Sequence, residues 1–232
     1  MRQLKVLISG GFTSAYEQLL PEFERTTGIK VTTGSGSSQG TGPQVIAAQL
    51  ARGVAADVAI LSRDGLDELI AANRIASGTD VDLARTPLGV AVRAGAAKPD
   101  LSTVDAFKRT LLNANAVAVP ASTSGIYLVS DLFPRLGIAE KIDIKVTPRG
   151  AGAAALVAAG DVKIAVMPVS EILGATGVDF AGAIPSEIQL VQVFSAAVVA
   201  GSRELGAANR LIAFLGSERA SAVIRSSGME PL

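Results

Sequence analysis

Small hydroxyl and glycine residues gather where apolar, strand-like runs give way to helical patterns. The longest such stretch is Val31–Pro43, with glycines at 34, 36, 40 and 42 and hydroxyls that include Ser37 and Ser38. Glycine lets a backbone turn tightly and approach a ligand, while hydroxyls supply hydrogen-bond donors. The first N–H groups of a helix have no partner inside the helix, so this loop indicates a small-anion site. Plain connectors share the composition and remain the alternative.

Three further helix starts repeat this chemistry after other strand-like runs, which gives four in the chain, two in each half. Their hydroxyls could equally act as helix caps and turn formers, each stabilising the fold by about 1 kcal/mol. Capping and anion binding use the same geometry, so the two roles can coexist. The candidate ligand-binding residues are Gly11, Phe12, Thr13, Ser14, Ser37, Ser38, Thr123, Ser124, Tyr127, Arg149 and Gly150.

Four side chains carry open alternatives. Arg149 fits a surface charge or an interlobe salt bridge as well as a ligand contact, and Tyr127, one turn into a helix, fits the core. Arg63 follows a strand and faces either a cleft or water. Glu171 is a possible proton-transfer base, with a solvated carboxylate as the simpler reading. If the protein is an enzyme, Arg149, Tyr127 and Glu171 are the catalytic candidates.

The chain contains no cysteine and no histidine. Disulfides, cysteine nucleophiles, Ser-His-Asp triads, zinc sites built on His or Cys, and iron–sulfur clusters are therefore excluded. No metal site and no cofactor are expected. Any chemistry must come from carboxylates, Lys, Arg, Tyr, hydroxyls or the backbone.

Charge and hydropathy narrow the range of possible binding partners. The 21 Lys and Arg balance the 21 Asp and Glu, and no basic run interleaves with aromatics, so we expect no nucleic-acid partner. The apolar runs fall short of the roughly 20 residues that span a membrane, so we expect no membrane insertion. The start shows no signal peptide, which favours a cytoplasmic protein, or a periplasmic one if the chain is a processed form.

The order of elements predicts a mostly parallel α/β fold. Apolar runs at Leu4–Ser9, Ile29–Thr33 and Ala56–Leu61 are typical of buried strands, and helical patterns separate them. We expect a helix from a capping box at Ser14–Glu17 to Gly28, with a kink at Pro21, and another helix from Pro43 to Arg52. A strand-helix-strand rhythm of this kind favours a parallel sheet.

A second unit is expected to begin near Thr86 and to repeat the pattern. Later expected strands lie at 88–93, 116–120, 142–147, 163–167 and 189–200. Helical patterns over 204–215 and 217–226 have no strands of their own and should pack on the first unit. The predicted lobes are 1–85 plus 195–232 and 86–194, with a ligand cleft between them.

The sequence resembles type II periplasmic solute-binding proteins, most closely the molybdate-binding-protein family of ABC transporters. The resemblance covers essentially the whole chain in order. The residues that carry it are Gly10–Ala15, Gly36–Ser38, Ala47–Val58, Thr123–Tyr127, Gly152–Val157 and the terminal Arg219 to Met229 section.

The resemblance implies an oxyanion held between two lobes by backbone N–H groups and hydroxyls. Gly11 lies where the family often uses serine, and Ser38, Ser124 and Gly150 match its other contacts. Pro168 stands where molybdate binders typically place a tyrosine. Arg149 adds a positive charge that those sites usually lack, which favours a carboxylate ligand, because an Arg fork pairs bidentately with carboxylates.

Two functions follow as expectations. The first is a monomeric binding protein that closes on a small anion, molybdate-like or carboxylate, with an ABC transporter permease as possible partner. The second is an isomerase of a small di- or tricarboxylic acid, since relatives of the family include aconitate isomerases. A ligand-sensing domain is a weaker third, because no DNA-binding segment is present.

Overall fold

The computed structural model describes residues 3–232. Its contacts group the chain into two compact units, Met1–Arg85 with Val193–Leu232, and Thr86–Gln192. The chain passes from one unit to the other within two strands, β4 (Val81–Arg93) and β9 (Val191–Val198). The first unit is therefore discontinuous in sequence, whereas the second is continuous.

The sheet of the first unit is parallel at its centre. Strand β1 (Gln3–Ile8) lies between β2 (Lys30–Ser35) and β3 (Val58–Ser62) and is parallel to both. Strand β9 runs antiparallel to β3, with Ser62 opposite Phe194. The short β10 (Glu230–Pro231) pairs antiparallel with the start of β4.

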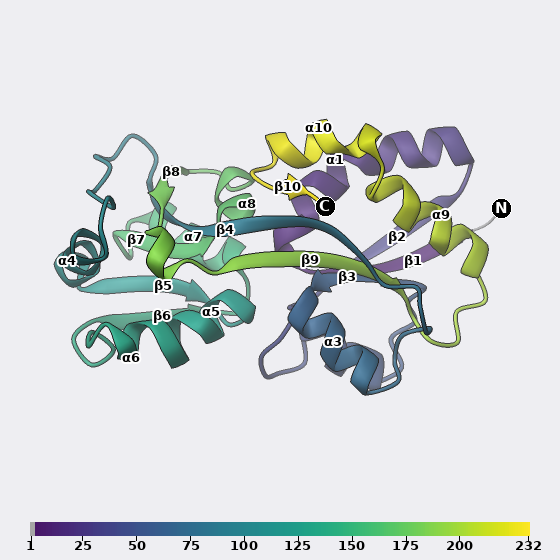
Figure 1. Cartoon of the computed structure of the whole chain (residues 1–232), viewed down its shortest axis with the longest axis horizontal. Coiled ribbons are helices and arrows are strands. Elements are labelled where there is room, and N and C mark those ends of the chain that lie inside the picture. Colours follow the sequence, from purple (N-terminus) through teal and green to yellow (C-terminus); the bar gives the residue numbers. More distant parts are fainter. Residues whose placement is uncertain (1–2) are drawn as a thin grey trace. The chain divides into compact units, whose positions relative to one another are not determined.

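Helices cover both faces of this sheet. Helix α1 (Gly10–Thr27) contacts α9 (Leu205–Leu215) and α10 (Glu218–Ser226), as Figure 1 shows. Helices α2 (Ile46–Ala51) and α3 (Arg63–Ala71) belong to the other face. Leu4, Val6 and Ile8 of β1 pack with the α1 side, whereas Leu7 packs with the α2 side. Strand β1 thus has apolar side chains on both of its faces, because successive side chains of a strand point to opposite faces.

The second unit is built on the same plan. Strand β5 (Ala116–Pro120) lies between β6 (Asp143–Thr147) and β7 (Ile164–Pro168), and all three are parallel. The second half of β4 runs antiparallel to β7 and also pairs with β8 (Val178–Ala183).

The two faces of the second sheet differ in the size of their side chains. One face packs Val90, Val117 and Val166 with α4 (Val104–Ala114) and with the segment after β5. The other packs Ala91, Ala118 and Ala165 against α7 (Gly150–Ala159). Small side chains on both partners let this alanine-rich helix lie close to the strands. The segment after β5 comprises α5 (Thr123–Tyr127), a π-helical turn (Leu128–Leu132) and α6 (Phe133–Arg135).

The predicted parallel α/β class is confirmed, but several helix starts were placed wrongly. Helix α1 begins at Gly10, not at the proposed capping box, so Ser14 is an interior residue of the helix. It also continues through Pro21. Helix α2 begins at Ile46 rather than Pro43, because Val45 is still extended and forms a β-bridge with Ser37. Gly28 and Gly160 end their helices in the left-handed conformation, as expected.

Some elements were not predicted at all. These are β8, β10, α8 (Val169–Leu173) and a 3-10 turn at Ser186–Ile188. They are short, and β8 (sequence VDFAGA) carries two alanines and a glycine, which weaken the strand signal. Among the described helices, none is both long and apolar enough to cross a membrane.

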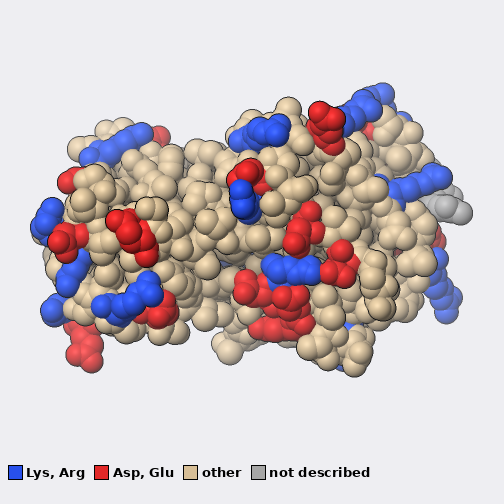
Figure 2. All heavy atoms as spheres, viewed as in Figure 1, with Lys and Arg blue, Asp and Glu red and all other residues tan. Residues whose placement is uncertain are grey.

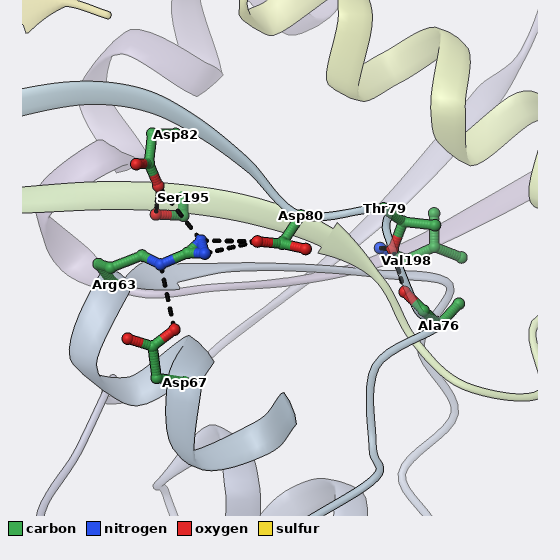
Figure 3. A network of polar contacts seen from close by, with 8 residues as sticks. All are labelled: Arg63, Asp67, Ala76, Thr79, Asp80, Asp82, Ser195 and Val198. Atoms are coloured by element: carbon green, nitrogen blue, oxygen red, sulfur yellow. Dashed lines mark hydrogen bonds and ion pairs between the residues drawn. The ribbon is translucent and has the colours of Figure 1, made fainter. Parts of the chain in front are cut away.

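Arg63, left open by the sequence, joins an ion-pair network at the start of α3 (Figure 3). Its guanidinium contacts Asp80 at 2.5 Å and Asp67 at 3.1 Å, and reaches Asp82 at 3.3 Å. Ser195 of β9 donates to the Asp82 carboxylate at 2.6 Å. The network ties α3 to the segments by which the chain leaves and re-enters this unit. Figure 2 shows acidic side chains gathered over this part of the unit.

Gly11, in the first turn of α1, lies against the ring of Phe194. A Cβ added at position 11 would overlap the Phe194 ring. Both residues are buried, and Phe194 belongs to the core cluster that packs around α1. The ring fills the space that a side chain at this position would need. This explains why glycine stands where the resembling family often has serine.

We expect Gly11→Ala to lower the free energy of unfolding by about 1–3 kcal/mol, because the methyl group overpacks the core. Phe194→Leu in the same chain should recover part of the loss. Gly206→Ala is the matched control, since nothing lies within 4 Å of a Cβ at that helical position. The control should be neutral or stabilising by about 0.5–1 kcal/mol. Urea denaturation measures each value, and an unchanged midpoint for Gly11→Ala would contradict the packing argument.

Candidate functional site

In each unit, helix starts follow the carboxyl ends of the parallel strands. Helices α1 and α3 follow β1 and β3 in the first unit, and α5, α7 and α8 follow β5, β6 and β7 in the second. Because the carboxyl ends of parallel strands meet at one sheet edge, ligands of such folds bind there. Each unit therefore brings its own candidate residues together at one edge.

The α1 start combines an anion-binding geometry with a buried hydroxyl. Ser9 is the N-cap residue, and its N–H donates to Ile60 O at 2.8 Å. The Ser9 Oγ is buried and has no partner within residues 3–232. Thr13 donates its hydroxyl to Ser9 O at 2.9 Å. The N–H groups of Gly11 and Phe12 fall in the first turn, where no carbonyl of the same helix can accept them, whereas the Thr13 N–H faces the Ser9 carbonyl.

Ser37 and Ser38 lie beside this start, after β2. The N–H of Gly36 donates to Ile8 O at 3.0 Å, which anchors the loop next to β1. Ser38 is 2% exposed, and its Oγ accepts a hydrogen bond from the Ser62 N–H at 2.8 Å. Accepting this bond leaves the hydroxyl hydrogen of Ser38 as a donor for another group. The N–H of Ser37 donates to Gln44 O, so this backbone donor is already used within the loop.

In the second unit, Thr123 and Ser124 form the first turn of α5. Both are buried, at 7% and 2% exposure. A Cβ at Gly125 would collide with the carbonyl of Pro120, so only glycine allows the strand to turn so sharply into the helix. This close approach fixes Thr123 and Ser124 at the end of β5.

The α7 start places a cation and a carboxylate side by side. Arg149 is the N-cap residue, and Glu171 of α8 accepts a hydrogen bond from the Gly150 N–H. A Cβ at Gly150 would overlap the Glu171 carboxylate. The Nε atom of Arg149 is buried without a partner, and the residue forms no salt bridge in the described part of the chain. The positive end of α7 is therefore occupied by the protein's own carboxylate, with the Arg149 cation nearby.

The environment of Glu171 changes its acidity. Burial of the carboxyl group raises its pKa to about 7, while the charge of Arg149 and the Gly150 hydrogen bond act in the opposite direction. Glu171 as a whole residue keeps intermediate exposure. Near neutral pH this carboxyl group can both accept and give up a proton, which is the property of a general acid–base group. The structure therefore argues against the alternative, left open by the sequence, of a freely solvated Glu171 carboxylate.

Three other candidates have different surroundings. The Phe12 side chain is fully buried in the core, which leaves only its backbone N–H for a ligand. Ser14 lies beyond the first turn of α1 and is contacted by Gln18. The Tyr127 hydroxyl donates to Ile188 O at 2.8 Å and accepts from Arg135 at 3.2 Å, so its single proton is already used. These contacts favour the core alternative for Tyr127.

Sequence reasoning missed two buried hydroxyls at the same edges. Ser9 and Ser170 are 3% and 1% exposed, and the Oγ of each lacks a partner among the described residues. Ser9 was assigned to the end of a strand, although a serine just before Gly10–Gly11 fits an N-cap. Ser170 precedes Glu171 in a helix too short to predict. Within residues 3–232, no group of acidic side chains is arranged to hold a metal ion.

Residues 4–230 match the family model for bacterial extracellular solute-binding proteins. The chain belongs to this family. A relative named aconitate isomerase, from Pseudomonas sp, is 37% identical over 234 residues, covering 99% of this chain and 88% of the relative.

Solved structures share the fold at lower identity. The periplasmic molybdate-binding protein of Azotobacter vinelandii superposes with a TM-score of 0.73 at 21% identity, covering 97% of this chain and 98% of the other. The sulfate-binding protein SubI of Mycobacterium tuberculosis gives a TM-score of 0.79 at 18% identity, covering 100% and 88%. The predicted type II solute-binding fold is thus confirmed.

Glu171 should make stability depend on pH. Its folded pKa of about 7 lies above its ordinary value of 4.5, so the folded chain holds this proton more tightly than the unfolded chain. The free energy of unfolding should therefore fall as pH rises from about 4.5 to 7, by up to about 3 kcal/mol relative to Glu171→Gln. Urea denaturation at several pH values measures this difference.

The exposed Glu140 supplies the control for that measurement. Glu140→Gln should follow the wild type across the whole pH range. If wild type and Glu171→Gln differ by the same amount at pH 5 and pH 8, the assigned burial of this carboxyl group is wrong.

Proposed function

We propose that the chain binds a small organic anion with several carboxylates, and that Arg149 at the start of α7 pairs with one of them. The observation that carries this proposal is the Arg149 Nε, which is buried without a hydrogen-bond partner among the described residues. A buried donor without an acceptor is costly, and a ligand carboxylate would supply that acceptor. The planar guanidinium can pair with a carboxylate through two parallel hydrogen bonds.

In the second unit, we assign the first turn of α5, with the buried Thr123 and Ser124, to further ligand oxygens. In the first unit, taken by itself, we propose the α1 first turn with Ser37 and Ser38 as a set of residues suited to an anion. The Gly150 N–H already holds Glu171, so a ligand at α7 meets the Glu171 carboxyl group as well.

The relatives support an anion as ligand. Two similar structures are named for molybdate and sulfate binding, and the 37% identical relative is named for aconitate, a tricarboxylate. Within this proposal, the charge of Arg149 is the reason for favouring a carboxylate ligand. As a binding protein, the chain would deliver its ligand to an ABC transporter permease from the periplasm.

The binding proposal is tested with a thermal-shift panel of molybdate, tungstate, sulfate, succinate, tricarballylate and citrate. The tricarboxylates should stabilise the protein most, by about 2.7 kcal/mol at a concentration one hundred times the dissociation constant. Arg149→Met should weaken their binding roughly tenfold to a hundredfold, because a charge-assisted hydrogen bond is lost.

Arg109→Met removes an exposed guanidinium of α4 and should leave binding unchanged. Preferential stabilisation by molybdate or sulfate, with no effect of Arg149→Met, would overturn the carboxylate assignment.

A second candidate is isomerisation of aconitate, favoured by the pKa of Glu171 and by the named relative. The Glu171 carboxylate would remove a proton from the methylene carbon next to the double bond, leaving a three-carbon anion stabilised by its carboxyl groups. Return of the proton at the far carbon of this anion forms the new double bond at the former methylene carbon. The conformation in which the substrate is held about that bond decides which isomer is released. No oxidant or other reactant is needed, and Arg149 would hold a substrate carboxylate.

Proton NMR of cis- and trans-aconitate incubated with the protein tests the catalytic step, and solvent deuterium in the product reports the proton transfer. Glu171→Gln should lower kcat by roughly a hundredfold to ten-thousandfold with KM changed little, the range expected for loss of a general base. Arg149→Met should mainly raise KM. Saturable aconitate binding without interconversion would exclude the enzyme and leave the binding proposal in place.

A further inference from the structure

The second unit contains a pocket that the proposed function does not use. Its volume is about 460 Å³, within the range of sites that hold small organic molecules. The pocket lies where α4 and α7 end and where β7 begins, with the turn after β4 on its rim. All of its lining residues belong to the second unit.

The pocket has an apolar floor. Val92, Val157, Val162 and Ile164 line it, and each is at most 4% exposed. Val92, Val157 and Ile164 belong to β4, α7 and β7, and Val162 lies in the turn between α7 and β7. The rim includes Ala96 and Ala97, whose small side chains leave the entrance open.

Two cations stand at the entrance. Arg93 and Lys163 line the pocket, and the lining includes no carboxylate. Both side chains are on exposed residues, and neither forms a salt bridge in the described part of the chain. Lys163 Nζ donates only to the carbonyl of Asn113, at 3.3 Å, and Arg93 lies beside Gly160. Most of their donors are thus available to a ligand with negative charge.

Helix α7 separates this pocket from the Arg149 site. Arg149 and Gly150 stand at its start, whereas Val157 and Gly160 line the pocket at its end. The helix has 10 residues, which places the two sites about 15 Å apart along its axis. A ligand in the pocket therefore contacts none of the residues assigned to the polycarboxylate.

From this arrangement we infer a second binding site, for an amphipathic monocarboxylate. The apolar chain of the ligand packs on the valine and isoleucine floor, and its carboxylate pairs with Arg93 and Lys163. A fully apolar molecule would leave both cations unused, and a small polar anion would leave the floor exposed to water. Aliphatic monocarboxylates combine the two properties that the lining requires.

Octanoate is the probe, with octanol and acetate as matched ligands that lack its charge or its apolar chain. Two-dimensional amide NMR titration should show saturable shifts for residues 92–99, 110–114 and 157–164. Octanoate should bind at least about fivefold more tightly than octanol, since a pair of exposed cations contributes roughly this much. Acetate should produce no saturable shift at these residues.

Variants separate the charges from the cavity. Arg93→Gln/Lys163→Gln should reduce octanoate affinity to that of octanol, whereas Lys141→Gln/Lys145→Gln makes the same change in net charge away from the pocket and should have no effect. Ala97→Trp should block both octanoate and octanol by filling the entrance. The far-ultraviolet circular dichroism and melting temperature of each variant confirm that it is folded.

Two results would overturn the inference of a monocarboxylate site. One is equal affinity of the wild type for octanoate and octanol, and the other is an Arg93→Gln/Lys163→Gln variant whose octanoate affinity is unchanged. Shifts confined to residues around Arg149 would place octanoate in the polycarboxylate site and would also overturn it. Because the Arg149→Met variant retains this pocket, its octanoate binding tests the second site independently of the proposed function.

Discussion

The hydrogen bond from Gly150 to Glu171 is the contact on which the candidate chemistry depends. It needs a glycine, because any side chain at position 150 would occupy the space of the carboxylate. It also places the carboxyl group where burial raises its pKa to about 7, near Arg149, whose Nε is buried without a hydrogen-bond partner among the described residues. A cation and a carboxyl group with a pKa near neutrality therefore lie at one helix start. In the proposed function, the same arrangement would serve ligand capture and, if the protein is an enzyme, proton transfer.

The sheets make such helix starts possible by burying both of their faces. In the first unit, β1, β3 and β9 direct alternate side chains toward α1 on one face and toward α2 and α3 on the other. In the second unit, alanines on the strands face the alanine-rich α7. Strands buried on both faces leave no free surface except at their ends. Polar chemistry is accordingly concentrated at those ends.

Much of this plan is legible in the sequence, because two-sided strands give continuous apolar runs. Leu4–Ser9 and Ala116–Pro120 were recognised in this way, and Gly28 and Gly160 marked the ends of their helices. The helix starts were harder, since Ser14 and Glu17 imitate a capping box although the backbone turns at Ser9. The environment of Glu171 could not be predicted from the sequence, because it depends on the packing of α7 against α8, and β7 separates these helices in the chain. The engagement of Tyr127 with Ile188 is equally a tertiary contact, and nothing local announces it.

The discontinuity of the first unit has a consequence for biosynthesis. Its strand β9 and helices α9 and α10 come from the last part of the chain, and Phe194 completes the packing around α1. During translation, the early segment of this unit must wait with an open sheet edge and an exposed apolar face until residues 193–232 leave the ribosome. The continuous second unit can complete its own core sooner. The nascent chain is therefore most vulnerable to aggregation in its oldest segment, the one that was synthesised first and is finished last.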